Sequence, residues 1–486
     1  MDRRGFLKLG AQVAAAGAAA GAIGSAAAAA AENAFASEVH RATKFTSILD
    51  GAPSDSGIDH VVIVMMENRS FDSYLGWLSK DQLYWDTGRS RYGKSFAVNG
   101  NLHQVFTAPD GTRVKTEPHG VMAGPINIWE GCGHNDPGHG WDQGRAERDG
   151  GFLASGSGND NLALEYFRAT DLPIYQALAR HYTICDDWHA SLLGPTYPNR
   201  EYHVSGQSGG HKDNYLPIAE GGFQWPAIFD RLSAAGVSVT DYASDFPTFV
   251  LWGNRAEPLI RTYDDFKTDA AAGTLPSVSY VEPHFIGDLE NDDHPLADPR
   301  GGQQFIRDVV RTLVRSRLWQ KSLLIINYDE WGGFFDHVAP PVVADDRSSP
   351  IDEDNFGQCG FRVPNFLVSP YALPNYVDHT QYDHTSVLRF LEWRFLGAPA
   401  NGTSGNPSNP WWLTTRDRNA KNLGRSLSKE AFDPAIHFDI NMALQDPSPP
   451  CAENATLVDA THPFAEAVAA GYLERIGLSK RLSHVG

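Results

Sequence analysis

Two short apolar runs, far apart in the chain, each end in a cluster of polar residues. The first is Val61–Met66, which has no polar alternation and is therefore typical of a strand buried on both faces of a parallel sheet. Directly after it come Glu67, Asn68, Arg69 and Ser70. Sites in open α/β sheets form beyond the carboxyl ends of strands, so this position favours a functional role. A polar turn that caps the next helix explains the same four residues equally well.

The second run repeats this design at Leu323–Ile326 and is followed by Asp329 and Glu330. Adjacent carboxylates repel, and burying them without a counter-charge is unfavourable. A bound cation removes that conflict; the alternative is a salt-bridged turn. Gly332 and Gly333 follow at once and let the backbone pass close to whatever lies there. We therefore favour a cation site at this turn.

Along the rest of the chain, predicted strands alternate with predicted helices, which favours an α/β fold with a mostly parallel central sheet, helices on both faces and long loop insertions. Further strands are expected at 237–242, 277–281 and 363–368, and helices at 161–184, 225–235, 301–319, 387–395 and 463–476. The helical pattern at 161–184 is expected to break or restart at Leu172-Pro173. Residues 79–135 have little periodicity and predict a long excursion at the edge of the sheet. The acidic stretch 341–356 predicts a surface loop, and 401–410 a linker.

The acidic balance of the chain narrows the possible partners. Its 486 residues carry a formal net charge of -19 and contain no cluster of Lys and Arg. A surface that follows nucleic-acid phosphates needs such a cluster, so we expect no nucleic-acid partner. An acidic surface also has no general attraction to anionic membranes. The chain contains neither a P-loop nor a G-x-G-x-x-G dinucleotide signature.

Residues 1–36 are expected to lie outside the fold. The twin arginines Arg3 and Arg4 are followed by an Ala/Gly-rich stretch and by Ala34-Phe35-Ala36, which resembles a twin-arginine export signal with its cleavage site. The implied partner is the twin-arginine export machinery, and the implied location is the periplasm, the cell surface or the extracellular space. We expect residues 37–486 to form a single domain, with a core at about 58–396 and a C-terminal extension at 397–486.

The four cysteines, Cys132, Cys185, Cys359 and Cys451, include no C-x-x-C spacing. A zinc cluster is therefore not expected. In an oxidising compartment one or two disulfides are compatible with this sequence, and three pairings are open.

Between the two polar clusters lie residues suited to phosphate chemistry. Thr196 stands between Pro195 and Pro198; this is either a rigid structural loop or a fixed nucleophile, which a metal or a base would have to activate. Histidines occur at three polar turns, namely His139, His284 and His294. Carboxylate and amide oxygens suit a divalent cation, and histidines can neutralise phosphate oxygens. Together these parts predict phosphoryl transfer.

Four blocks, at residues 59–72, 194–200, 291–295 and 328–337, resemble the bacterial phospholipase C / acid phosphatase phosphoesterase family. The blocks occur in matching order between about residues 58 and 396. The resemblance implies an alkaline-phosphatase-like fold, which is α/β.

The resemblance also implies roles for individual residues. The ligands of a divalent metal ion would be Glu67, Asn68, Thr196, Asp329 and Glu330, and Thr196 would also be the nucleophile that forms a covalent intermediate. The residues that hold phosphate oxygens or protonate the leaving group would be His139, His284 and His294, with His337 or His384 as replacements for one of them. Some members carry Ser at the Thr196 position and Asp at the Glu330 position, which preserves this chemistry.

The expected function is an exported, metal-dependent phospholipase C that cleaves the glycerol-side phosphodiester of phospholipids. Its substrate would be a phospholipid or a small phosphoester, reached by peripheral contact with a membrane. The first alternative is a broad-specificity acid phosphatase. The second is an inactive phosphate- or lipid-binding protein, against which the presence of Thr196 and the acidic ligands argues.

Overall fold

The computed structural model describes residues 45–93, 96–120, 129, 131–295, 297–403, 411–448 and 463–475. The predicted export signal at 1–36, Cys451 and most of the 401–410 linker lie outside the described residues.

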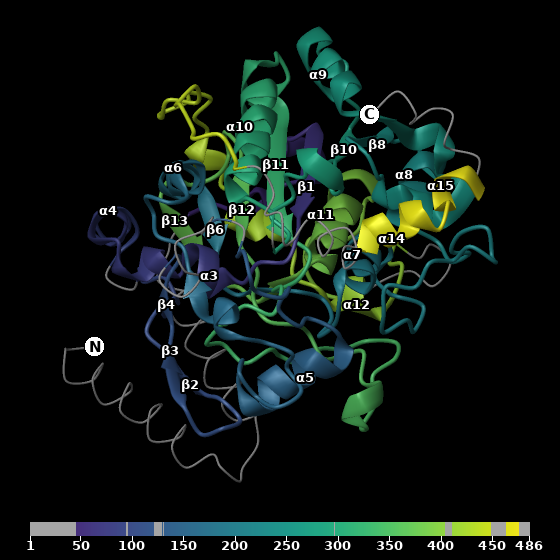
Figure 1. The fold of residues 1–486 in the computed structure, drawn as a ribbon. Coiled ribbons are helices and arrows are strands. Elements are labelled where there is room, and N and C mark those ends of the chain that lie inside the picture. The colour runs from purple at the N-terminus through teal and green to yellow at the C-terminus, as the bar shows by residue number, and fades with distance from the viewer. Residues whose placement is uncertain are drawn as a thin grey trace.

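The core is an eight-stranded sheet with the order β13-β6-β12-β11-β1-β10-β8-β9 (Figure 1). Strand β12 is antiparallel to both of its neighbours, and the other strands pair in parallel. The α/β class with a mostly parallel sheet is therefore confirmed. The strands are β1 (His60–Met66), β6 (Thr183–Cys185), β8 (Val239–Ala243), β9 (Ile260–Thr262), β10 (Val278–Val281), β11 (Ser322–Tyr328), β12 (Asn365–Val368) and β13 (Tyr376–Asp378).

The two predicted apolar runs form neighbouring central strands. β1 and β11 pair in parallel from His60↔Ser322 to Met66↔Tyr328, and β10 pairs with the other edge of β1. β11 is buried along its whole length, and β1 is buried from Val61 onward, as continuous apolar runs predict. Because the strands run in parallel, the polar clusters that follow them meet at one edge of the sheet.

Helices cover both faces of the sheet. Side chains of successive strand residues point to opposite faces of the sheet. The contacts of two neighbouring residues on β11 therefore identify a helix on each face. Tyr328 meets Tyr175 of α6 (Pro173–His181), whereas Asn327 meets His384, which precedes α11 (Thr385–Leu396). The remaining helices are α3 (Phe71–Leu75), α4 (Gln82–Tyr92), α5 (Trp141–Gly150), α7 (Thr196–Ser205), α8 (Ile228–Ala234), α9 (Tyr263–Ala272), α10 (Pro299–Arg315), α12 (Thr415–Asn419), α14 (Pro463–Ala469) and α15 (Tyr472–Arg475).

The insertion after α3 contains more regular structure than its sequence predicts. It holds α4 and a hairpin of β2 (Val105–Thr107) and β3 (Arg113–Lys115). In Figure 1 this hairpin and α5 lie below the central strands. Helix α4 buries only Tyr84 and Gly88, and this explains why its sequence has no apolar stripe.

The predicted restart of the helical pattern at Leu172-Pro173 is confirmed, whereas the predicted helix before it is wrong. Only Pro173–His181 is α-helical, and it follows a 3₁₀ turn (Asn161–Leu164) and the two-residue strand β5 (Glu165–Tyr166). Pro173 occupies the first turn of α6, where proline starts a helix more readily than it continues one. The last predicted residues of that helix belong to β6 instead.

The predicted C-terminal helix exists as the short pair α14 and α15, and it packs on the main body. Phe464 of α14 contacts the rings of Tyr197, Phe246 and Phe285. The Tyr197 hydroxyl donates to the carbonyl of Pro463 (2.6 Å). The C-terminal extension is thereby attached to α7.

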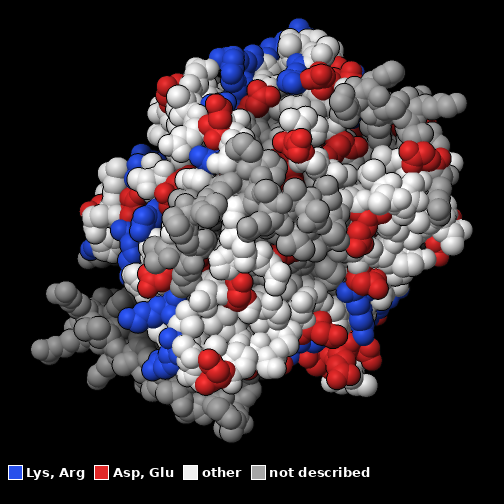
Figure 2. Space-filling model, viewed as in Figure 1, with Lys and Arg blue, Asp and Glu red and all other residues white. Residues whose placement is uncertain are grey.

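Of the described cysteines, Cys132 is disulfide-bonded, whereas Cys185 and Cys359 are buried free thiols. Within the described ranges, none of the helices has the length and apolar character needed to cross a bilayer. Figure 2 shows acidic and basic side chains scattered over one face, with acidic ones grouped at the lower right. The predicted loop at 341–356 contains exposed acidic residues at 352–354.

Candidate active site

Two backbone contacts join the turn after β1 to the turn after β11. The N–H of Asn68 donates to Asp329 Oδ1 (3.0 Å), and the N–H of Arg69 donates to the carbonyl of Glu330 (3.1 Å). Asn68 has a φ of 55°, in the left-handed region that asparagine tolerates better than most residues. The two polar clusters are therefore side by side, as the parallel strands predict.

Gly332 makes this close approach possible. Its φ is 62°, and a Cβ at this position would lie 2.1 Å from the carbonyl oxygen of Asn68. The Gly332 N–H donates to Glu330 Oε2 (2.7 Å). The structure thus confirms that a glycine is needed where the two turns meet.

Three carboxyl groups at this edge of the sheet, Glu67, Asp329 and Glu330, are fully buried. Burial raises the pKa of Glu67 and of Glu330 well above the ordinary value, and the nearby charge of Asp329 raises both further. Burial raises the pKa of Asp329 to about 6, although Arg200 opposes this shift. Burial and mutual repulsion thus disfavour the charged forms of these carboxyl groups, and a bound cation would offset both effects.

The Asn68 side chain fits the same cation. One terminal atom of its amide lies 2.6 Å from Glu330 Oε1 and 3.2 Å from Asp329 Oδ1, and the other lies 2.9 Å from His294 Nε2. With nitrogen toward the carboxylates, the amide donates to both of them. With oxygen there, three oxygen atoms converge, which is the donor set of a hard divalent cation. The residues present therefore fit a divalent metal ion.

Thr196 is the first residue of α7 and is fully buried. Among the described residues, its hydroxyl has no hydrogen-bond partner. Asn199 fixes the preceding loop, because its Nδ2 donates to the carbonyls of Gly194 (2.9 Å) and Pro195 (3.1 Å). These contacts hold the loop before Thr196, and the hydroxyl of Thr196 lies at the positive end of a helix.

Arg200 lies one helical turn after Thr196 and connects α7 to the carboxylates. Its Nη2 lies 3.0 Å from Glu67 Oε1, and its Nε lies 3.5 Å from Asp329 Oδ2. Its Nη1 lies 3.3 Å from Glu282 Oε2, just beyond the end of β10. The helix that carries Thr196 is thus tied to the ends of three adjacent strands.

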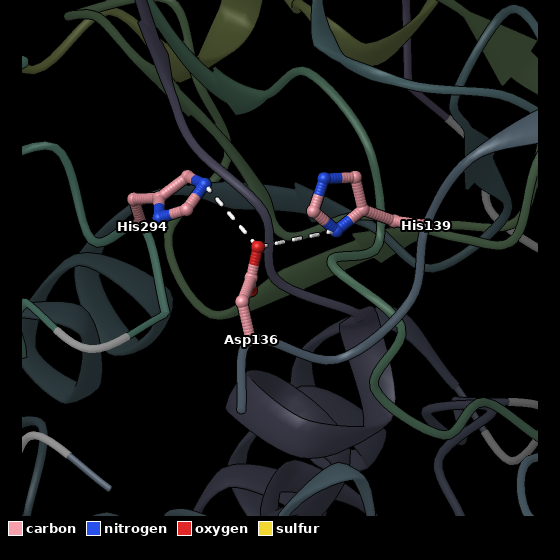
Figure 3. A group of neighbouring side chains, drawn as sticks. All are labelled: Asp136, His139 and His294. Atoms are coloured by element: carbon pink, nitrogen blue, oxygen red, sulfur yellow. Dashed lines mark ion pairs between the residues drawn. The ribbon is translucent and has the colours of Figure 1, made fainter. Parts of the chain in front are cut away.

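Two of the predicted histidines meet next to this cluster. Asp136 Oδ2 lies between His139 Nδ1 (4.0 Å) and His294 Nε2 (3.9 Å) (Figure 3). These three groups could surround a cation, but both Nδ1 atoms already face backbone carbonyls, at 2.9 Å from Pro137 and from Pro295. Those contacts make each Nδ1 a donor, so Nε2 is the atom left for other partners.

The Nε2 atoms point these histidines toward the metal-ligand candidates. His139 Nε2 lies 3.9 Å from Glu330 Oε1, and His294 Nε2 lies 2.9 Å from the Asn68 amide. His139 and His294 thus border the carboxylate cluster on one side.

The other two histidine candidates on this edge have different surroundings. His284 follows Glu282 after β10 and lies 3.7 Å from Asp245 through Nδ1. His384 is buried, with its Nε2 2.5 Å from the carbonyl oxygen of Asp329. Burial lowers the pKa of His384 to about 4, so its ring is neutral. This neutral ring contacts the backbone carbonyl of Asp329.

A sequence model of the phosphoesterase family matches residues 58–396. The chain belongs to the phosphoesterase family. This confirms the family inferred from the four sequence blocks and the enzyme class, a phosphoric ester hydrolase.

Relatives of this phosphoesterase include plant and bacterial proteins. Non-specific phospholipase C1 of Arabidopsis thaliana is 33% identical over 68% of the chain and 65% of its own length. Phospholipase C B of Mycobacterium tuberculosis is 33% identical over 70% of the chain and 74% of its own length. The hemolytic phospholipase C of Pseudomonas aeruginosa is 29% identical over 81% of the chain and 58% of its own length.

Solved structures give weaker likenesses. An alkaline phosphatase superfamily protein from Vibrio parahaemolyticus is 8% identical, covers 91% of the chain and 96% of its own length, and has a TM-score of 0.36. The lipoteichoic acid synthase LtaP of Listeria monocytogenes is also 8% identical, covers 91% of the chain and 98% of its own length, and has a TM-score of 0.35. At these TM-scores neither likeness carries an argument about this phosphoesterase.

The structure places His337 in a second cluster of the phosphoesterase. Its Nδ1 lies 2.6 Å from Asp72 Oδ2, and its Nε2 lies 3.0 Å from Asn99 Oδ1. Arg362 is buried between Asp72 (3.2 Å) and Asp336 (3.0 Å). This cluster lies between α3 and the loop after β11, and its members Asp72, Asp336 and His337 could also surround a cation. The substrate-binding role of His337 stays a prediction.

Sequence reasoning missed two residues of the site, Asp136 and Arg200. Asp136 stands three residues before His139, within a Gly- and Pro-rich turn that gave no reason to separate it from a solvated loop. Arg200 had a usable signal, because it follows Thr196 by four residues and therefore shares its helix face.

Proposed function

We propose that this phosphoesterase is an exported, metal-dependent phospholipase C that cleaves the glycerol-side phosphodiester of phospholipids, with Thr196 as the nucleophile. The observation that carries the proposal is the buried, unpartnered hydroxyl of Thr196, on a helix tied by Arg200 to a set of buried carboxylates. The phospholipase C names of the relatives support the choice of substrate class.

The groups that would hold the divalent metal ion are Glu67, Asn68, Thr196, Asp329 and Glu330. A metal ion there would supply positive charge that favours the ionised form of the Thr196 hydroxyl and neutralises phosphate oxygens. The donors are oxygen atoms, which suits a hard or borderline divalent cation.

Different residues of this chain would carry out the successive steps of the reaction. The proton of the Thr196 hydroxyl passes to a histidine as Oγ1 attacks phosphorus, and a Thr–O–P bond forms as the bond from phosphorus to the glycerol oxygen breaks. His139 and His294 hold phosphate oxygens, and a histidine gives its proton to the departing diacylglycerol oxygen. Water then attacks phosphorus and releases the phosphorylated head group, which restores Thr196. His284 lies at the same edge of the sheet and is the third histidine proposed to hold phosphate oxygens or to protonate the leaving group.

An acid phosphatase remains the second candidate, because Thr196 and the same ligands would also hydrolyse a monoester. The two candidates are distinguished by p-nitrophenyl phosphorylcholine, a diester, and p-nitrophenyl phosphate, a monoester. We expect nitrophenol release from the diester, with none after chelation of divalent metal ions. Hydrolysis of the monoester alone would support the phosphatase, and hydrolysis of neither would favour a binding protein.

A further inference from the structure

Arg200 is a buried cation in contact with two carboxylates of the proposed metal site, Glu67 and Asp329. Its side chain is 1% exposed and is within 3.5 Å of Glu67, Asp329 and Glu282. Its Nη2 also donates to the carbonyl of Met65 (3.2 Å). These contacts fix the guanidinium on three sides, at the point where β1, β10 and β11 end.

Several buried carboxyl groups lie close to this guanidinium. Glu330 and Asp292 are also buried at this edge of the sheet. In the protein without a metal ion, Arg200 therefore places a positive charge beside Glu67 and Asp329.

The C-terminal extension helps to hold Arg200 in place. Its guanidinium carbon lies 4.8 Å from the centre of the Phe285 ring and 5.3 Å from that of Phe464. Both distances allow a cation–π contact. Phe464 belongs to α14, so a helix of the C-terminal extension contacts Arg200.

We propose that Arg200 is a positioning residue that acts as the fixed internal counter-charge of the metal site, and that Phe464 of α14 holds it there. The inference rests on the proposed metal site. Removal of one partner from a buried ion pair leaves an uncompensated charge, which strongly destabilises a protein. A bound metal ion would compensate Glu67 and Asp329 in place of Arg200, so the loss should be smaller in the metal-loaded protein.

The test is thermal unfolding of the full chain, after chelation and with saturating Ca²⁺, Mg²⁺, Mn²⁺ or Zn²⁺ added singly. Arg200→Met should lower the Tm of the chelated protein more than that of the metal-loaded protein. The metal-induced rise in Tm should therefore be about twice that of the unsubstituted protein. Arg200→Lys keeps the charge and should give an intermediate rise; it carries the test if Arg200→Met does not fold.

Three further changes separate this role from general stabilisation. Arg416 is another buried arginine and pairs with Asp383 (2.6 Å) and Asp345 (3.3 Å), so Arg416→Met should lower the Tm equally with and without metal. Phe464→Leu keeps apolar volume but removes the aromatic face, and should increase the metal-induced rise. Tyr472→Phe, in neighbouring α15, removes a hydrogen bond to Val250 (2.9 Å) and should leave that rise unchanged.

The possible failures are distinguishable. If metal ions raise the Tm of the unsubstituted protein but raise that of Arg200→Met by no more, the role of Arg200 is wrong and the metal site stands. If no metal ion changes the unsubstituted Tm, the metal site itself is overturned, and this inference with it. If the expected pattern appears in a protein that hydrolyses neither nitrophenyl substrate, the role of Arg200 holds and the proposed reaction is wrong.

Discussion

The proposed reaction depends on Thr196, because its hydroxyl group would be the nucleophile. Pro195 precedes the helix, and Asn199 ties the loop before it to the first turn. The hydroxyl makes no hydrogen bond to the described part of the chain, so its removal deprives the fold of little. This absence of a structural contact is what the proposed role as nucleophile requires.

Thr196→Ala should lower kcat by at least about 10³-fold, because the nucleophile is lost. Its Tm should stay within a few degrees of the unsubstituted value, since no hydrogen bond is broken. Thr196→Ser keeps the hydroxyl and should retain much of the activity. Steady-state hydrolysis of p-nitrophenyl phosphorylcholine measures both variants, and full activity of Thr196→Ala would rule out this nucleophile.

Asn68 and Ser70 are close in sequence, but their contacts predict opposite losses. The Ser70 hydroxyl accepts from the N–H of Ser73 at the start of α3 (3.2 Å) and donates to the carbonyl of Phe335 (2.6 Å). Ser70→Ala should therefore lower the free energy of unfolding by about 1 kcal/mol and leave metal content unchanged. Asn68→Ala should lose bound metal with a smaller effect on unfolding. Denaturant unfolding and elemental analysis compare the two, and equal metal loss would contradict the distinction.

At the scale of elements, the site depends on how closely the turns after β1 and β11 approach each other. Gly332 and Gly397 both have positive φ, but only Gly332 lies against another backbone, whereas a Cβ at Gly397 would meet no atom within 4 Å. Gly332→Ala should lower the free energy of unfolding by about 3 kcal/mol and reduce metal content. Gly397→Ala should cost about 1 kcal/mol, from backbone strain alone. Similar losses in both variants would show that the contact with Asn68 does not matter.

These elements also show what sequence can and cannot predict. The buried strands and their polar ends were predictable because continuous apolar runs and charged termini are local patterns. Helix α4 was not, since it buries only Tyr84 and Gly88. In the segment at 161–184, the helix start at Pro173 was predictable from the proline, whereas the 3₁₀ turn and β5 before it were not.

The site residues follow the same rule. Glu67, Asn68, Asp329 and Glu330 end neighbouring strands, so their proximity followed from the parallel sheet. The position of His337 did not, because Asp72 and Arg362, which lie next to it, are far away in sequence. Asp136 stands beside His139 and His294 through the folding of a long insertion that has no periodicity.

At the scale of the whole molecule, the chain is proposed to act outside the cytoplasm. Replacement of both Arg3 and Arg4 by lysine should keep the protein inside the cell, because the paired arginines are the recognised feature of the proposed signal. Exchange of Arg41 and Lys44 for lysine and arginine, beyond the signal, is the matched control and should not affect export. Immunoblots of cell fractions measure the outcome, and normal export of the double lysine variant would contradict the signal assignment.

The central claim, a nucleophilic Thr196, is tested most directly by mass spectrometry of protein quenched in acid during turnover of p-nitrophenyl phosphorylcholine. The predicted result is a phosphorylcholine group on the peptide that contains Thr196, and no such group in the Thr196→Ala protein. A phosphorylcholine group on any other residue of the unsubstituted protein would contradict the claim.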